Sequence, residues 1–171
     1  MHTDLLSLAK RIAKFDPKRP KQANLRKAIS AAYYALFQFL VDQSCRQAMG
    51  TTHATTIMRQ VLARSFTHFG ISLACKAFSA GSRLTHPATR ALRTTFSIPA
   101  EVQQIALTFV SLQERRHTAN YDFTQRFSRS EVLGVIREVE IAINQFGQLK
   151  SSDEKSFLLA CLWAWKTIGS R

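Results

Sequence analysis

The stretch that decides the fold is Arg26-Lys27-Ala28-Ile29-Ser30-Ala31-Ala32-Tyr33-Tyr34-Ala35-Leu36-Phe37. Apolar residues recur in it every three or four positions, which is the period of an amphipathic helix. Two apolar stripes run along this helix, about 100° apart, and one of them contains Arg26 and Tyr33, with Tyr34 beyond. Two stripes indicate either a central helix or a helix that also meets a second subunit.

Helical periodicity continues through most of the chain, and no repeat, low-complexity tract or convincing strand pattern occurs. Prolines and glycines divide the pattern into helices, because a residue before proline avoids the helical region and glycine commonly follows a helix end. The sequence therefore predicts an all-α bundle of five to seven helices, with an up-down core of four long helices. Residues 82–98 give no clear prediction. The expected helices span residues 4–15, 21–49, 51–69, 71–80, 99–120, 130–147 and 152–168.

Length and composition fit one domain with a substantial core. A chain of 171 residues, 46% of them hydrophobic, is long enough to bury such a core. We expect a single domain over residues 1–171, with a basic helix and connector over 1–21, a core over 22–149 and an apolar C-terminal helix over 152–168. The apolar run Phe157–Trp165 is too short for a membrane span, which needs about 20 residues, so we expect no membrane partner.

The ionisable residues indicate a polyanionic partner. The net charge is +13, and no Asp or Glu occurs between Asp42 and Glu101. A field of one sign attracts polyanions, of which nucleic acid is the most obvious, although a solvated basic surface or an acidic protein partner also fits. The three cysteines are far apart and form no pair typical of zinc knuckles or disulfide frameworks, so we expect a reducing, cytoplasmic location. The histidines are scattered, and we expect neither a metal nor a cofactor.

The second informative stretch is Arg116-His117-Thr118-Ala119-Asn120-Tyr121-Asp122. Arg116 falls in the middle of the apolar stripe of its expected helix, one turn after Leu112, with Arg115 and His117 on opposite flanks. An arginine that faces a core needs a carboxylate, a ligand phosphate or a neighbouring chain. The alternative is a stem that packs while the head group reaches water at the helix end. Within the chain, the candidate carboxylates are Asp42, Glu114 and Asp122.

Together the two stretches resemble the HEPN domains (higher eukaryotes and prokaryotes nucleotide-binding), in which an early helix reads roughly R-x-A-[IV]-S-x-A-Y-Y-A-x-F. A later helix of that family ends in arginine, followed a few residues on by histidine or, in some branches, tyrosine. The resemblance covers roughly residues 25–149 apart from 82–98. It implies a small helical bundle that dimerises, so that two arginine-containing helix ends form one basic cleft. The active members of the family are metal-independent ribonucleases.

Carried over by position, Arg116 matches the motif arginine, and Tyr121 takes the place of the motif histidine. The resemblance implies that the arginine steadies charge on the scissile phosphate while the histidine acts on the 2′-hydroxyl. Tyrosine is a poor general base at neutral pH, so His117 is the candidate substitute. The candidate catalytic residues are Arg116, His117 and Tyr121. The candidate nucleic-acid-binding residues are Arg26, Tyr33, Tyr34, Arg115, Asn120 and Asp122.

The resemblance and the charge predict a protein that binds RNA or a nucleotide, with endoribonuclease chemistry in a toxin–antitoxin or phage-defence module. One alternative is a non-catalytic adaptor that binds RNA or protein, in which Tyr121 is structural. Another is a toxin-like substrate whose Tyr121 hydroxyl accepts a nucleotidyl group from a partner nucleotidyltransferase that acts as antitoxin. Tyr33 and Tyr34 also have a plainer interpretation, as core aromatics whose hydroxyls are satisfied.

Overall fold

A computed structural model describes residues 1–79, 99–149, 159 and 162 of the chain. Residues 82–98 and almost all of the helix expected over 152–168 lie outside these described residues. The described part contains six α-helices and one 3-10 turn and has no strand, which confirms the all-α bundle. The elements are α1 (His2–Ala13), α2 (Gln22–Met49), η1 (His53–Thr55), α3 (Thr56–Ala63), α4 (His68–Ser79), α6 (Ala100–Tyr121) and α7 (Arg129–Gln148).

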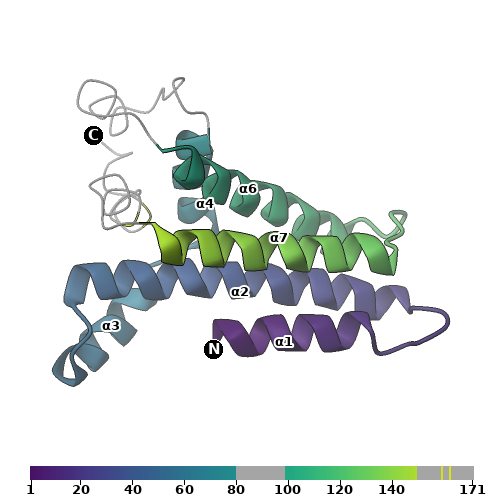
Figure 1. Cartoon of the computed structure of the whole chain (residues 1–171), viewed down its shortest axis with the longest axis horizontal. Helices are drawn as coiled ribbons and strands as arrows, with labels where there is room; N and C mark the ends of the chain where they lie inside the picture. Colours follow the sequence, from purple (N-terminus) through teal and green to yellow (C-terminus); the bar gives the residue numbers. More distant parts are fainter. Residues whose placement is uncertain (80–98, 150–158, 160–161, 163–171) are drawn as a thin grey trace.

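The long helix α2 lies at the centre of the bundle and contacts α1, α3, α6 and α7 (Figure 1). Chain direction alternates along α1, α2, α6 and α7, as the up-down prediction requires. Residues from both stripes of α2, such as Leu36 and Tyr33, are buried in the chain's own core. Each large apolar side chain buried in this way contributes roughly 1.5–3 kcal/mol. Both stripes are therefore used within the chain, so they are not by themselves evidence for a second subunit.

Local sequence signals explain where several helices begin and end. Gly50 follows α2 with a φ of 75°, a conformation that glycine adopts without a steric penalty. Ser128 caps α7, because its hydroxyl accepts from the Glu131 amide while the Glu131 carboxylate accepts from the Ser128 amide. The helix predicted after Pro99 forms as α6, with Pro99 immediately before its first residue.

The prediction of one helix over 51–69, ended by Gly70, is wrong. The segment forms a 3-10 turn and the short helix α3, and α4 begins at His68 and runs through Gly70. Gly70 is buried, and a Cβ there would lie 3.1 Å from the Thr67 hydroxyl oxygen, which itself accepts from the Gly70 amide. The missing side chain thus permits close packing at the start of α4 rather than ending a helix.

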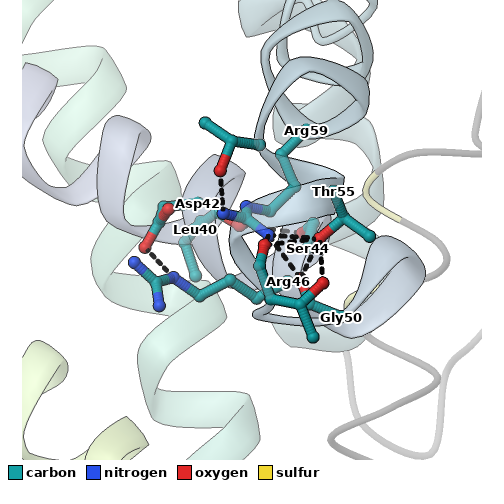
Figure 2. A network of polar contacts seen from close by, with 9 residues as sticks. Leu40, Asp42, Ser44, Arg46, Gly50, Thr55 and Arg59 are labelled. Carbon is teal, nitrogen blue, oxygen red and sulfur yellow. Dashed lines mark hydrogen bonds and ion pairs between the residues drawn. The ribbon is translucent and has the colours of Figure 1, made fainter.

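The corner between α2 and α3 is held by one arginine, Arg59 (Figure 2). Its guanidinium donates to the carbonyl oxygens of Gly50 and Thr52 at 2.9 and 3.0 Å. It also donates to the hydroxyls of Thr55 and Thr56 at 2.5 and 3.0 Å. Carbonyls that follow a helix end have no partner within the helix, so a side chain that supplies donors stabilises the turn.

Candidate functional site

Arg116, near the C-terminal end of α6, lies half-buried in a corner formed by two tyrosine rings of α2. The guanidinium carbon is 5.0 Å from the centre of the Tyr33 ring and 5.3 Å from that of Tyr34. One terminal nitrogen donates to the Tyr34 hydroxyl at 3.2 Å. The two rings meet edge to face, with centres 5.5 Å apart, and present their electron-rich surfaces to the cation. The first informative stretch therefore packs directly on the second.

No described carboxylate forms an ion pair with Arg116. Asp42 binds Arg46 at 2.7 Å, and Asp122 is engaged in the turn that follows α6. The Nε of Arg116 is buried and has no hydrogen-bond partner among the described residues. A buried donor without an acceptor is costly, and the two tyrosine rings are the groups that stabilise the charge of Arg116 among the described residues. Of the alternatives for Arg116, a carboxylate partner is therefore not found among the described residues, and a ligand phosphate or a neighbouring chain stays a prediction.

His68, at the start of α4, also belongs to this cluster, although the scattered histidines did not indicate this from the sequence. Its Nδ1 lies 2.8 Å from the Tyr33 hydroxyl, and its ring centre is 4.2 Å from that of Phe37. Burial, and then the charge of Arg116, lower the pKa of His68. Burial raises the pKa of the fully buried Tyr33 hydroxyl, which fits a protonated hydroxyl that donates to a neutral imidazole.

A groove of about 280 Å³, which we call the α4–α6 groove, opens beside this cluster. It contains two of the candidate catalytic residues, Arg116 and His117, together with Lys76 from α4. Among the described residues that line it, Glu114 is the only acidic one. Its described lining consists of Phe69, Ser72, Leu73 and Lys76 from α4 and Gln113, Glu114, Arg116 and His117 from α6. The groove thus combines an aromatic ring, three basic side chains and three side chains that can accept hydrogen bonds, namely Ser72, Gln113 and Glu114.

Tyr121 lies one helical turn after His117, and the two ring centres are 4.8 Å apart. The Tyr121 side chain is 64% exposed, so its hydroxyl is accessible to solvent or to another molecule. Histidine and tyrosine at this spacing share one face of a helix. The three candidate catalytic residues are therefore connected, Arg116 and His117 through the groove and Tyr121 through its contact with His117.

Three other candidates hold the end of α6 in place. Arg26 donates to the carbonyl oxygens of Ala119 and Gln125 at 2.7 and 2.6 Å. The Asn120 amide oxygen accepts from the Ser30 hydroxyl at 3.0 Å. Asp122 accepts from the hydroxyl and amide of Thr124 and from the amide of Gln125, and these bonds lower its pKa. Their polar groups are thus engaged within the chain and support the helix end that carries Arg116 and Tyr121.

Arg115 points to another part of the molecule. It pairs with Glu138 of α7 at 3.3 Å and lines a separate hollow of about 420 Å³ between α6 and α7. A larger hollow, of about 440 Å³, lies between the start of α1, α2 and α3, and it contains the Asp42–Arg46 pair. Neither hollow contains Arg116, His117 or Tyr121. We therefore place the candidate site at the α4–α6 groove on chemistry rather than on size.

Comparisons of this chain with models of protein families, with curated proteins and with solved structures find no match. Within the described ranges, no three His, Cys, Asp or Glu side chains gather as they would around a metal ion. None of the helices in the part of the chain that the structure describes has the length and apolar character needed to cross a bilayer. The case for a function consequently depends on the geometry of the groove and on the resemblance of the two motifs.

Proposed function

We propose that this chain is a HEPN-like protein that binds RNA in the α4–α6 groove, with Arg116 on a phosphate. The observation that carries the proposal is the state of Arg116, which is half-buried, donates one hydrogen bond and forms no ion pair among the described residues, and lines the groove with Lys76 and His117. Arginine offers phosphate oxygens two parallel donors, and a guanidinium partly withdrawn from water binds an anion more strongly than an exposed one. The net charge of +13 favours the approach of RNA to the protein.

The same residues support cleavage of RNA without a metal. In this mechanism His117 takes the proton of a 2′-hydroxyl, and the 2′-oxygen then attacks the adjacent phosphorus. The bond from phosphorus to the 5′-oxygen of the next nucleotide breaks, and that oxygen takes a proton from water. The products carry a 2′,3′-cyclic phosphate and a 5′-hydroxyl. Arg116 stabilises the negative charge that develops on the phosphate oxygens.

A second copy of the chain is part of the proposal. Tyr121, the last residue of α6, and Phe123, just after the helix, are 64% and 84% exposed. Aromatic side chains are enriched at protein interfaces, and pairing at this end of α6 would bring two copies of Arg116 towards one cleft. We place such a dimer in the cytoplasm, in a toxin–antitoxin or phage-defence module. A solution mass equal to that of one chain at low micromolar concentration would contradict the shared cleft.

The proposal is tested by comparing Arg116→Ala with Arg64→Ala, which removes an equal charge from an exposed position at the end of α3. We expect Arg116→Ala to lose binding and cleavage of a labelled RNA in EDTA, and Arg64→Ala to retain both. His117→Ala should bind RNA but no longer cleave it. An Arg116→Ala protein that folds, binds and cleaves like the parent would show that the site is wrong. Binding without turnover by the parent would favour the adaptor function.

Modification of Tyr121 is the second candidate function, and the 64% exposure of its side chain favours it. In this reaction the phenol oxygen attacks the α-phosphorus of ATP, a nucleotidyl group is transferred and pyrophosphate leaves. Incubation with ATP and a candidate nucleotidyltransferase should raise the mass of the Tyr121 peptide, and Tyr121→Phe should abolish the increase. No increase with a transferase that is active on another substrate would exclude this function for that pair.

A further inference from the structure

Phe69 is a large aromatic side chain that lines the α4–α6 groove and is nevertheless 70% exposed. Phe69, Leu73 and Lys76 are spaced by four and three residues, so they occupy one face of α4, and all three line the groove. Arg116 and His117 line it from α6. The groove therefore places an accessible phenyl ring beside two cationic side chains, Lys76 and Arg116.

We propose that Phe69 stacks against a base, and that the RNA bound in the groove is single-stranded there. This inference rests on the proposed function, because it assumes that Arg116 and Lys76 bind phosphates. Proteins that bind single strands combine a basic groove for the backbone with aromatic side chains on which bases stack. In a duplex the bases are already stacked on each other, and their faces are not available to a side chain.

The size and lining of the groove agree with an unpaired nucleotide. Its volume of about 280 Å³ is close to the lower end of the roughly 300–1,000 Å³ of small-molecule sites. Gln113 and Glu114 place an amide and a carboxylate in the same groove. These groups can bind the hydrogen-bonding edge of a base, which is exposed only where the strand is unpaired. The carboxylate of Glu114 also suits an N–H of a base, such as the N3–H of uracil, better than a second phosphate.

The test measures affinities for an oligouridine of about ten nucleotides and for an abasic oligomer with the same number of phosphates. Phe69→Ala should weaken binding of the oligouridine by about 5- to 100-fold, and Phe69→Trp should restore it. Phe15→Ala is the matched control, because Phe15 lies beyond the end of α1 and is 71% exposed. This control should bind like the parent. Thermal unfolding of each variant establishes that the bundle is intact.

The abasic oligomer separates stacking from phosphate binding. The parent and Phe69→Ala should bind the abasic oligomer with equal affinity, because it offers no base to stack. Arg116→Ala should lower the affinity for both oligomers. The inference would be overturned if Phe69→Ala lowered the affinity for both oligomers equally, or if it changed neither affinity. So would a duplex that binds the parent as tightly as the single strand at equal phosphate number. An Arg116→Ala protein with parental affinity for both oligomers would instead contradict the proposed function.

Discussion

Arg59 on α3 and Arg116 on α6 are both half-buried arginines, yet their surroundings satisfy them to different degrees. Arg59 donates four hydrogen bonds, two to carbonyls and two to threonine hydroxyls (Figure 2). Arg116 donates one, to Tyr34, and its Nε has no partner among the described residues.

The difference follows from what each arginine packs against. Arg59 faces the turn after α2, where backbone carbonyls have no partner inside a helix. Arg116 faces the sides of α2 and α4, where the backbone carbonyls are already used in helical hydrogen bonds. It therefore contacts two aromatic rings and donates to one hydroxyl. An arginine against a turn can use both terminal nitrogens on acceptors of the chain, as Arg59 does, whereas Arg116 between helix flanks donates a single hydrogen bond among the described residues. Arg26 resembles Arg59 in this respect, because it donates to one carbonyl in the last turn of α6 and to another in the loop that follows.

The largest expected effect is on RNA affinity when Arg116 is replaced by methionine, which keeps a packed stem. Loss of charge-assisted hydrogen bonds to phosphate should weaken binding by about 10- to 100-fold. The free energy of unfolding should change by no more than about 1 kcal/mol, because lost cation–π contacts are offset by removal of a buried unpaired donor. Fluorescence anisotropy and urea unfolding measure the two quantities. A large loss of stability with unchanged affinity would assign Arg116 to the structural class of Arg59.

The reverse result is expected for Arg59→Ala. Removing four hydrogen bonds at the α2–α3 turn should lower the free energy of unfolding by about 1–2 kcal/mol, since the freed carbonyls can still reach water. RNA affinity should stay within about twofold of the parent, as for removal of a distant charge. The same two assays apply. A tenfold loss of affinity in a folded Arg59→Ala protein would show that the basic surface around α3, and not the groove alone, contacts RNA.

A smaller effect is expected for Arg116→Lys, which retains the charge but loses the planar fork. The RNA affinity should fall by about 3- to 10-fold, to a value between the affinities of the parent and of the methionine variant. The slope of affinity against salt concentration should remain close to that of the parent, because the number of cations near phosphate is unchanged. A lysine variant as weak as the methionine variant would indicate that geometry matters more than charge in the corner of the two tyrosines.

The smallest effect is an acid sensitivity that arises from His68. Its pKa in the folded state is lowered by burial and by Arg116, while Tyr33 and Tyr34 from α2 are the other titratable groups that its ring contacts. The unfolded chain therefore binds more protons between the folded pKa and about 6.5, and stability falls as pH drops through that window. Urea unfolding at pH 7.5 and 5 should show a smaller acid loss for His68→Phe than for the parent. His53→Phe, at an exposed position, is the control and should retain the parental loss.

Much of the fold was predictable because its signals are local. The period of α2, the glycine after it and the proline before α6 each act over a few residues. The break between α3 and α4 was not predictable from the same rules. Glycine is a residue type that commonly ends helices, but the role of Gly70 depends on the position of the Thr67 hydroxyl, which only the folded chain defines.

The candidate site divides in the same way. The spacing of Arg116 within an apolar stripe predicted an inward-facing arginine, and the structure places it half-buried against α2. None of the candidate carboxylates forms an ion pair with Arg116 within the described residues, because charge in a sequence does not report which side chains meet. His68 and Phe69 carry no motif. Their relevance comes from α4 packing against α6, which brings them beside residues far along the chain.

The sequence by itself determined an all-α bundle, a strongly basic chain and an arginine that the helical period turns inward, since each of these depends on composition or on spacing of a few residues. Only the tertiary structure decided which arginines are satisfied, which aromatic rings stay accessible and which side chains share the α4–α6 groove. The physical reason is that hydrogen-bond satisfaction and burial are properties of neighbours in space. In a helical bundle those neighbours come from separate helices, whose packing the local pattern does not specify.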